Sequence, residues 1–312
     1  MEPKVGPRPG VRSEEGLVPP FSQFRCSPCC TTDTSDPVYS HATAGQSMWF
    51  QLPDGLHPDR DEFRPGDEPL TKADGVHERG MVQLPGDAIY AGQWLGDQRH
   101  GQGTMTRPDG GRYDGQFRHD KAHGVGRFRH ANGDVYSGQW LEDKAHGHGK
   151  FVHADGSSYE GDWEMDTKSG RGVETWADGS HFKGEYRNGM KHGTGFFQSA
   201  DSSTYSGHFV DDVMEGQGIY RFADGRVFTG AWHGSQMHGD GTMTWPDGCS
   251  YTGGFLEDRK SGEGTFTWAD GRSYSGQWEM GRQHGVGVFI DNKGRQRKGL
   301  WNEGQRLKWM DT

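Results

Sequence analysis

An aromatic residue, a glycine and a second aromatic residue recur at alternate positions along most of the chain. Tyr or Phe stands at position 1, Gly at position 3 and Trp, Phe or Tyr at position 5, and the pattern returns every 23 residues. Alternate residues of a strand point to the same face, so the pattern predicts a strand with two rings and a glycine on one face. The nine complete copies begin at Tyr90, Tyr113, Tyr136, Tyr159, Phe182, Tyr205, Phe228, Tyr251 and Tyr274.

The second half of each copy predicts a second strand and a turn. Positions 12 and 14 are Gly in all nine copies, and position 16 is aromatic or Met in eight, as in Phe128 and Phe266. Glycines in a strand leave room for large rings to lie across the backbone. Position 20 is usually Asp and position 21 is Gly in eight copies, which predicts a turn because Gly takes a positive φ without steric cost.

Each copy is therefore predicted to form one β-hairpin, which cannot bury its hydrophobic face alone. Stacked hairpins share that face, and the stability of such an array is a sum of nearest-neighbour contributions. The predicted fold is all-β, an elongated open array of stacked antiparallel β-hairpins. A half repeat at residues 77–89 precedes nine full repeats at 90–296, a partial capping repeat of one strand follows at 297–305, and residues 306–312 form a tail.

Residues 1–76 differ from the array and predict a largely disordered arm. They hold 11 of the 14 prolines, and acidic residues outnumber basic ones; such composition does not bury enough apolar surface to fold. Cys26, Cys29 and Cys30 lie in this arm. One CxxC without a second pair favours solvated thiols over S-acylation or zinc binding.

Composition changes the picture of the core and of the partners. The chain has 52 glycines and only 30% hydrophobic residues, yet 12% are aromatic, so rings rather than aliphatic side chains supply the core. The net charge of −10 argues against nucleic acid as a partner, because nucleic-acid binding needs a basic surface. No apolar run is long enough for a transmembrane helix, the start lacks a signal-peptide core, and four cysteines form no disulfide framework. We expect a cytoplasmic protein.

The repeated motif resembles a known family. The pattern YxGxWxxxxxHGxGxxxxxDG, as in YSGQWLEDKAHGHGKFVHADG at residues 136–156, resembles the MORN repeat (membrane occupation and recognition nexus). The resemblance implies stacked hairpins in a curved antiparallel array that serves as scaffold or docking surface, with any catalysis in a separate domain. Similar arrays occur in junctophilins, radial-spoke heads, plant phosphatidylinositol-phosphate kinases and a histone-lysine methyltransferase.

The chain departs from the family pattern at position 8, where the family commonly has Gly. Asp stands there in six copies, which predicts acidic hairpin tips and weakens an expectation of lipid binding. These residues are Asp97, Asp120, Asp143, Asp166, Asp212 and Asp258.

The aromatic row at position 5 is the candidate partner-binding groove. An open array does not bury both faces of every ring, so the row is either simply core or a half-exposed trough for a helix or extended peptide of a protein partner. The row comprises Trp94, Phe117, Trp140, Trp163, Tyr186, Phe209, Trp232, Phe255 and Trp278.

Histidine recurs at position 11, as in His100 and His146, with Ser or Glu in three copies. A metal or catalytic site needs one convergent set of ligands. A residue that recurs in each repeat and is replaceable by Ser favours a hydrogen bond that fixes the turn; a metal ladder and a partner-facing row are the alternatives. The GxG at positions 12 and 14 precedes a strand, whereas a phosphate loop precedes a helix. We therefore expect no cofactor, no metal and no catalytic residue.

Two places interrupt the pattern. Copies four to six carry Ser169, Glu174, Ser202 and Glu215, by neutral drift or because a bend or docking site lies there. The second place is a basic end at Lys293, Arg295, Arg297 and Lys298. Positive charges on a terminal strand block edge-to-edge pairing; the alternative is a contact with phosphate, lipid or an acidic partner.

These patterns predict a non-catalytic scaffold that binds protein partners, in a cytoskeletal or ciliary assembly by family analogy. The alternative from another class is a peripheral membrane tether that binds phosphoinositides weakly. Residues 90–312 carry 26 basic and 30 acidic residues, which weighs against a lipid surface. Open terminal strands also leave room for self-association.

Overall fold

The computed structural model describes residues 75–310. The arm predicted at residues 1–76, including its three cysteines, lies outside the described residues apart from positions 75 and 76. Within the described range every regular element is a β-strand, and the 21 strands form one sheet. The predicted all-β array of hairpins is confirmed.

Strands of two lengths alternate along the array. Seven-residue strands open the hairpins: β2 (Ile89–Leu95), β4 (Arg112–Arg118), β6 (Val135–Leu141), β8 (Ser158–Glu164), β10 (His181–Arg187), β12 (Thr204–Val210), β14 (Val227–His233), β16 (Ser250–Leu256), β18 (Ser273–Glu279) and β20 (Gln296–Asn302). Nine-residue strands return: β3 (Gln98–Thr106), β5 (Lys121–Arg129), β7 (Lys144–Val152), β9 (Thr167–Thr175), β11 (Met190–Gln198), β13 (Val213–Arg221), β15 (Gln236–Thr244), β17 (Arg259–Thr267) and β19 (Arg282–Ile290). Before them lies β1 (Val76–Gln83), and β21 (Gln305–Trp309) ends the array.

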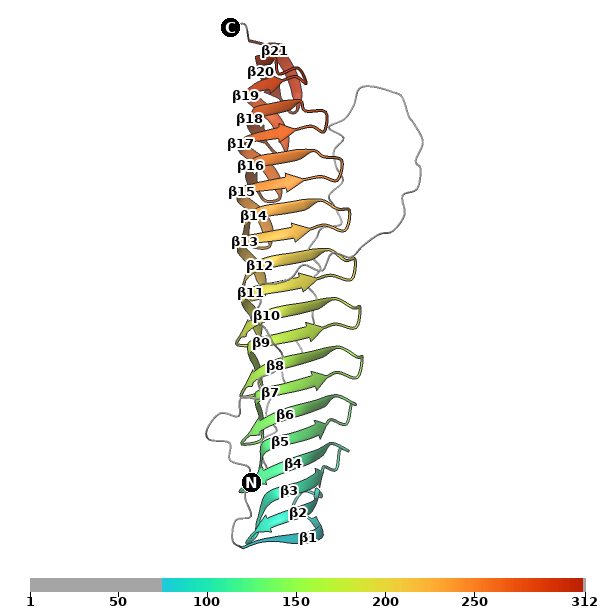
Figure 1. Cartoon of the computed structure of the whole chain (residues 1–312). Coiled ribbons are helices and arrows are strands. Elements are labelled where there is room, and N and C mark those ends of the chain that lie inside the picture. The colour runs from blue at the N-terminus through green and yellow to red at the C-terminus, as the bar shows by residue number, and fades with distance from the viewer. Residues whose placement is uncertain (1–74, 311–312) are drawn as a thin grey trace, which may run out of the picture. The chain divides into compact units, whose positions relative to one another are not determined.

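Consecutive strands pair antiparallel along the whole array, from β1 with β2 to β20 with β21. Figure 1 shows the hairpins stacked along one axis. The prediction that the last repeat ends after one strand, followed by a tail, is wrong. Residues 305–309 form β21, in which Trp309 lies opposite Gly299 and Arg306 opposite Trp301. One more hairpin thereby satisfies the edge of β20, which a tail would leave unpaired.

A bulge interrupts the pairing within each hairpin. In the first hairpin the register changes between Gly92 and Trp94. Gly101 on the returning strand has a φ of 65°, a conformation that favours Gly. The side chain of Gln93 accepts a hydrogen bond of 2.8 Å from the N–H of Gln102, so position 4 pairs with an N–H group in the bulge.

Glycines at positions 3 and 14 pair with one another both within hairpins and between them, as Gly115 pairs with Gly126 and Gly103. One glycine from each strand therefore lies in a continuous file across the sheet. The ring of Tyr113 lies over this file: a Cβ on Gly126 would come within 2.5 Å of the Tyr113 Cζ. The prediction that these glycines make room for large rings is confirmed.

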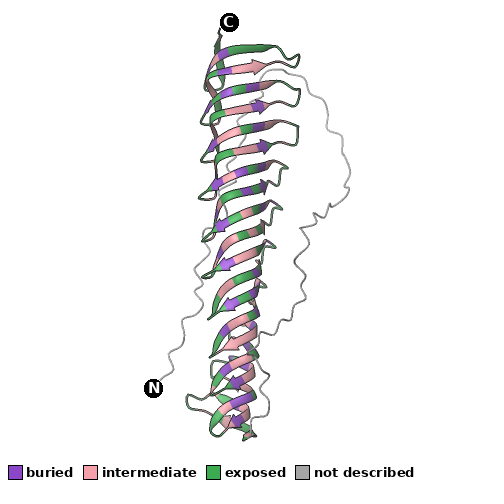
Figure 2. Ribbon diagram, turned by 60° about the vertical axis from the view of Figure 1, so that its left-hand side comes forward, coloured by how far each residue is buried: buried purple, intermediate pink, exposed green. Residues whose placement is uncertain are grey.

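Rings at positions 1 and 5 pack edge to face from one repeat to the next. The centroid of Tyr113 lies 5.0 Å from that of Phe117 and 5.2 Å from that of Trp140 in the following repeat. We call the face that carries positions 1, 5 and 16 the inner face, and the face that carries positions 2, 15 and 17 the outer face. Figure 2 shows the buried residues as short bands within the strands, with exposed residues at the turns.

Two kinds of turn border the sheet. At the tip edge (positions 7 and 8), two-residue turns have positive φ at both residues, such as 51° at Glu142 and 68° at Asp143, as in type I′ hairpins. At the loop edge (positions 18–22), an Asp side chain accepts a hydrogen bond from the backbone two residues later, as Asp155 does from the N–H of Ser157 at 2.8 Å. Gly156 between them has a φ of 90°, which confirms the predicted Asp-Gly turn.

Candidate binding surfaces

The predicted groove residues at position 5 form the interior of the array. Eight of the nine are buried; the exception, Trp140, is half-buried. Phe117, which is 1% exposed, packs between Tyr90 and Tyr113. These rings therefore pack against neighbouring repeats and leave no open trough. Truncating one would remove core packing worth about 3–5 kcal/mol, whether or not a partner binds.

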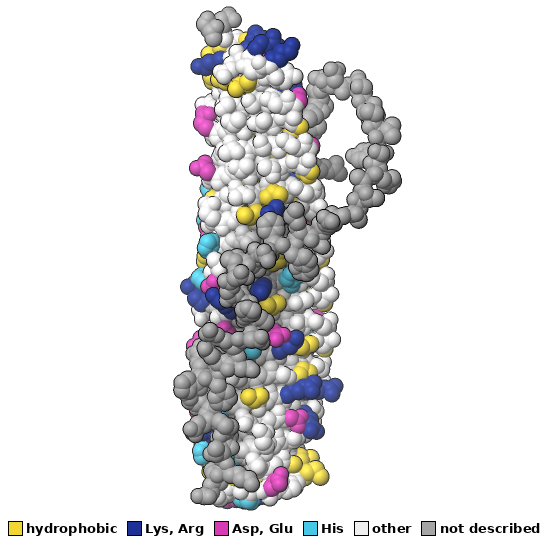
Figure 3. Space-filling view, viewed as in Figure 1, with side chains coloured by type: hydrophobic (Ala, Val, Ile, Leu, Met, Phe, Trp, Pro, Cys, Tyr) yellow, Lys and Arg dark blue, Asp and Glu magenta, His cyan; other side chains and the backbone are white. Residues whose placement is uncertain are grey.

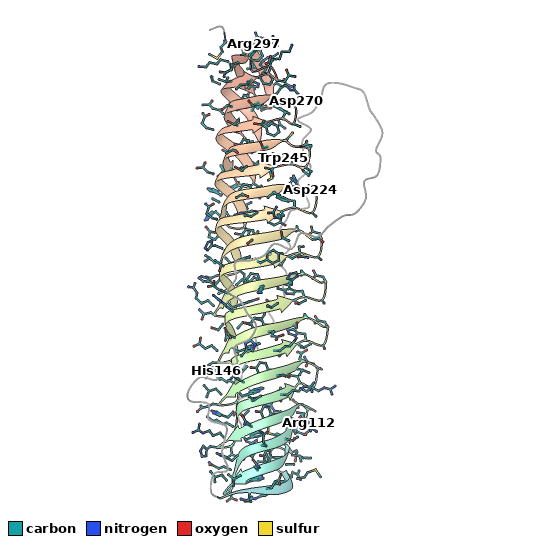
Figure 4. All side chains as sticks on the ribbon, in the orientation of Figure 1. Arg112, His146, Asp224, Trp245, Asp270 and Arg297 are labelled. Atoms are coloured by element: carbon teal, nitrogen blue, oxygen red, sulfur yellow. The ribbon has the colours of Figure 1, made fainter. Side chains whose placement is uncertain are left out.

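A second aromatic row, at position 18, is more accessible. It lies at the loop edge, where Figure 4 labels Trp245, and its four members are half-buried. Each packs edge-on or tilted against a position-16 ring, as Trp268 does against Phe266 with centroids 4.9 Å apart. The side chain of Arg226 lies 4.4 Å above the ring of Phe222. We call this set the edge row: Trp176, Phe222, Trp245 and Trp268.

The sequence signal for the edge row was present but weaker than that at position 5. Position 18 is aromatic in four copies only, with Arg, His, Ser or Asp in the others. Its exposure follows from its place at the end of the returning strand, where the neighbouring hairpin covers only part of the ring.

The hairpin tips are fixed by aspartate rather than by histidine. The carboxylate of Asp143 accepts a hydrogen bond of 2.7 Å from the N–H of Ala122 in the preceding repeat. The N–H of Asp143 in turn donates to the carbonyl of Ala122 at 3.0 Å. We call this pair of bonds the tip clasp. Carboxylates at four other tips accept the same bond: Asp120, Asp166, Asp212 and Asp258.

His100 and His146, two of the histidines at position 11, do not make the predicted turn-fixing bond. The Nδ1 atoms of His100 and His146 are buried and lack a hydrogen-bond partner among the described residues. Burial, with the neighbouring charges of His119 and Arg118, lowers the pKa of His100. His192 lies 3.3 Å from the carboxylate of Asp211. The recurring histidine therefore packs beside the tip, which the clasp holds in place.

The basic end is divided between two faces and a turn. Arg297 lies opposite Phe289 on the inner face, whereas Lys298 lies opposite Val288 on the outer face. Lys293 lies in the turn, and the Nε of Arg295 donates a 2.6 Å bond to Asp291. The four residues therefore do not form one contact surface.

The inner half of the basic end surrounds a tryptophan. The guanidinium groups of Arg297 and Arg306 each lie 4.2 Å from the centre of the Trp309 ring. A guanidinium group at this distance is attracted to the face of the ring. A cavity of about 360 Å³ beside them is lined by Phe289, Asp291, Arg295, Arg297 and Trp309. Figure 3 shows basic side chains gathered at this C-terminal end.

The interruption in copies four to six includes a polar network inside the array. Glu174 replaces the usual ring or Met at position 16 and pairs with the ammonium group of Lys168. Its second oxygen accepts a 2.8 Å bond from the hydroxyl of Tyr186. Burial and the charge of Glu174 raise the pKa of Tyr186.

The other two interrupting residues lie outside this network. Ser202 occupies a Gly position with a φ of 72°, and Glu215 pairs with His233 at 2.9 Å.

Other candidate chemistry is sparse in the described part of the chain. Residues 75–310 contain no group of three His, Cys, Asp or Glu side chains placed to hold a metal ion. Cys249, in a turn at the loop edge, is half-buried. No helix in this range is long and apolar enough to cross a membrane.

Comparison with family models gives one match. The MORN repeat model matches nine consecutive segments, which together cover more than half of the chain: residues 90–112, 113–135, 136–158, 159–181, 182–204, 205–225, 228–250, 251–271 and 274–294. A search of curated proteins finds no match to this chain.

Solved structures resemble the array only distantly. The TCP10 domain of Danio rerio CPAP, in complex with a STIL peptide, is 11% identical with a TM-score of 0.40, over 76% of this chain and 99% of that one. The SAS-4 (dCPAP) TCP domain of Drosophila melanogaster, with a proline-rich motif of Ana2, is 9% identical with a TM-score of 0.30, over 62% and 87%. Virginiamycin B lyase from Staphylococcus aureus reaches a TM-score of 0.14 at 9% identity, over 73% and 85%. TM-scores of this size do not establish a shared fold, and nothing about this chain's partners follows from them.

Proposed function

The chain belongs to the MORN-repeat family, and from this premise we propose that it is a non-catalytic scaffold that binds partner proteins. The observation that supports this function best is the edge row. Trp176, Phe222, Trp245 and Trp268 are half-buried rings along one border of the sheet. Large rings that are partly exposed and held by cations are typical of binding surfaces.

The partner expected on this row is an amphipathic helix or an extended peptide. Rings at the same position of successive hairpins form a line along the array axis, since each repeat adds two strands about 4.8 Å apart. A helix or a peptide presents side chains in such a line, whereas a small molecule occupies one enclosed pocket.

Affinity purification with matched variants tests the proposal. Full-length protein carrying Trp245→Ser and Trp268→Ser is compared with the unaltered protein in a native cell extract at low and at high salt. The fifth repeat already has Ser at position 18, as Ser199, so the array accepts Ser at this position. We expect a discrete protein that survives high salt with the unaltered chain and is lost with the double variant.

The control variant is Phe196→Ser, which removes a ring that is 37% exposed on the outer face. It should retain the same partner. Capture that depends on Phe196 and not on the edge row would assign binding to the outer face. Turnover of a substrate by the purified chain would contradict the scaffold function itself.

A peripheral membrane tether is the second candidate. It is favoured by the basic end, since residues 291–310 carry six basic and two acidic side chains and anionic lipid surfaces attract such clusters. The protein should float together with vesicles that contain a phosphoinositide. Replacing Lys293, Arg295, Arg297 and Lys298 by Gln should abolish this flotation. Flotation that is unchanged by these replacements rejects this role for the basic end.

Cellular placement and self-association are further parts of the proposal. A cytoplasmic location, at the cytoskeleton or a cilium, follows from family analogy and is tested by imaging a tagged chain. Self-association would use β1 or β21, each of which pairs on one side only. Light scattering over a concentration series measures it.

A further inference from the structure

Three arginines lie close together on the outer face of the hairpin formed by β4 and β5. Arg112 begins β4, and Arg127 and Arg129 lie on the neighbouring β5. The register places Arg112 directly opposite Arg129, and Asp114 directly opposite Arg127. In Figure 3 dark blue side chains gather on the lower right of the visible face, at the height where Figure 4 labels Arg112.

The single carboxylate of the cluster is already occupied. The Nε and Nη2 atoms of Arg112 each donate a 2.8 Å bond to Asp114, one to each oxygen. The hydroxyl of Thr104 donates a further 2.6 Å bond to Asp114. These bonds hold the pKa of Asp114 below its ordinary value, with the bond from Arg112 as the main cause, so Asp114 stays charged and committed to Arg112.

Arg127 and Arg129 are the two charges of the cluster that the described residues do not balance. Neither forms an ion pair with any residue between 75 and 310, and both are exposed. Three guanidinium groups face one carboxylate, a net local charge of +2. Like charges directly opposite each other in a sheet are destabilising, so this arrangement lowers the stability of the empty array.

No equivalent hairpin repeats this arrangement. The positions of Arg112 and Arg129 hold Val135 and Val152 in the next hairpin. In the later ones they hold pairs such as Ser158 with Thr175 and Val227 with Thr244. Within the described strands only β4 and β5 oppose two arginines at these positions. A feature confined to one repeat is not required by the fold.

The cluster borders an open hollow with room for an anion. A cavity of about 180 Å³ is lined by Arg112, Asp114, Arg127 and Arg129, against about 30 Å³ for one water molecule in the liquid. Guanidinium groups bind phosphate oxygens in bidentate fashion. A dianion between Arg127 and Arg129 would offset the net charge of +2. The repulsion among the guanidinium groups would then be replaced by attraction to the bound anion.

We propose that Arg127 and Arg129, with Arg112 beside them, bind a phosphate monoester, carried by a phosphorylated side chain of a protein partner. The anion site depends only on the cluster. Its source on a protein rests on the proposed scaffold function, because the partners of a scaffold are proteins. Asp114 limits the site to ligands whose oxygens reach Arg127 and Arg129 without approaching the carboxylate.

The test compares full-length protein with Arg127→Thr/Arg129→Thr. Thr occupies both positions in other repeats, as in Thr242 and Thr244, so the double variant is expected to fold. In chloride buffer we expect the variant to melt at a higher temperature, because the opposed charges are gone. Millimolar phosphate at constant ionic strength should raise the melting temperature of the unaltered protein and leave that of the variant unchanged.

Direct binding is measured by calorimetry with inorganic phosphate and with N-acetyl-phosphoserine amide. Both should bind the unaltered protein, and the double variant should bind each at least tenfold more weakly. Arg221→Thr is the matched control, because Arg221 occupies the position of Arg129 but lies opposite Thr204. It should bind both probes like the unaltered protein.

Three outcomes would overturn the proposal. A phosphate effect no larger than that of chloride, or one retained by the double variant, removes the anion site. Binding of vesicles with phosphorylated headgroups through Arg127 and Arg129, with no binding of the phosphoserine probe, reassigns its source to lipid. These results are independent of the edge-row experiment, because the two surfaces share no residue.

Discussion

Single glycine and tyrosine residues account for the close approach of rings and backbone in this array. Tyr113 is 2% exposed, and its hydroxyl donates a 2.9 Å bond to the carbonyl of Gln116. The ring covers the paired glycines Gly115 and Gly126. A side chain on either glycine would have to displace the ring and, with it, the contacts that the ring makes with Trp140 in the next repeat.

Replacing Gly126 by Ala tests this packing. The added methyl group overlaps Tyr113, so we expect a loss of about 2–4 kcal/mol, at or above the usual cost of overpacking. Gly80→Ala is the control, because nothing lies within 4 Å of its added Cβ and its φ is not in the left-handed region. It should change the melting temperature little. Equal effects of the two substitutions would mean that the ring does not lie on the glycine file.

The polar network of Lys168, Glu174 and Tyr186 contains a charge pair whose contribution to stability can be measured. The side chain of Glu174 is 13% exposed and that of Lys168 is 26% exposed. Glu174→Ala should destabilise by about 2–4 kcal/mol, since it leaves Lys168 unpaired inside the array. The double variant Lys168→Ala/Glu174→Phe copies Ala145 and Phe151 of the preceding repeat. It should melt at or above the temperature of the unaltered protein; a double variant as unstable as the single one would show that the pair is required.

Residue patterns predicted the fold but not the exposure of each ring. Alternation of Tyr, Gly and Trp is visible within five residues, so the strand and its inner face followed from local sequence. The exposure of Phe117 depends on Tyr90 and Tyr113, which lie in two repeats. The tip clasp joins residues that are 21 apart in the chain. No pattern within one repeat contains such a contact, and the sequence therefore left position 5 open between core and groove.

At the scale of the hairpin, the tip clasp links five hairpins to the hairpin before each of them. Asp143 combines two properties at one residue: its φ is 68°, and its carboxylate binds the N–H of Ala122. Asp tolerates the left-handed region better than most residues. The Asp that replaces the family's Gly therefore exchanges conformational freedom for a bond between repeats.

Two substitutions at Asp143 separate these properties. Asp143→Ala loses the bond and keeps a side chain in the left-handed region, so we expect a loss of about 1–2 kcal/mol. Asp143→Gly loses the bond but removes the strain, so the change should stay within about 1 kcal/mol. Melting temperatures measure both. A larger loss with Gly than with Ala would show that the carboxylate bond outweighs backbone strain.

The tip turns also contain residues that are poorly suited to them. Met280 has a φ of 51° and precedes Gly281 at 82°, whereas another tip has Asn188 at 52° followed by Gly189. Asn-Gly is the preferred pair for a type I′ turn. Met280→Asn should therefore stabilise the array by about 0.5–1 kcal/mol, because Met280 is 65% exposed and little of its packing is lost. Asn188→Met should have the opposite sign; the same sign for both would contradict the turn assignment.

At the scale of the whole array, seven tyrosines at position 1 make stability depend on pH. Burial raises the pKa of Tyr90 and of Tyr274 to about 12, and it raises the pKa of the other five as well. Below pH 10 these phenols are neutral in both folded and unfolded chains. Above pH 10 the unfolded chain ionises first, so stability falls as the pH rises from 10 towards 12.

Thermal melting at pH 8, 10 and 11 checks this dependence. We expect the melting temperature to fall steeply between pH 10 and 11. Tyr205→Phe, which copies Phe182 and Phe228 at the same position, should fall less over that interval. A variant that loses as much as the unaltered protein would show that other groups cause the alkaline instability.

Each strand from β1 to β21 pairs with the next one, and this has a mechanical consequence. Backbone hydrogen bonds of an antiparallel sheet lie perpendicular to the strands, so here they point along the stacking axis. A force that pulls the two ends of the array apart loads the ladders in series, and the weakest ladder opens first while the others hold. The same array resists a force applied along the strands, because all bonds of a ladder then share the load. A protein built in this way sustains shear across its width far better than tension along its length.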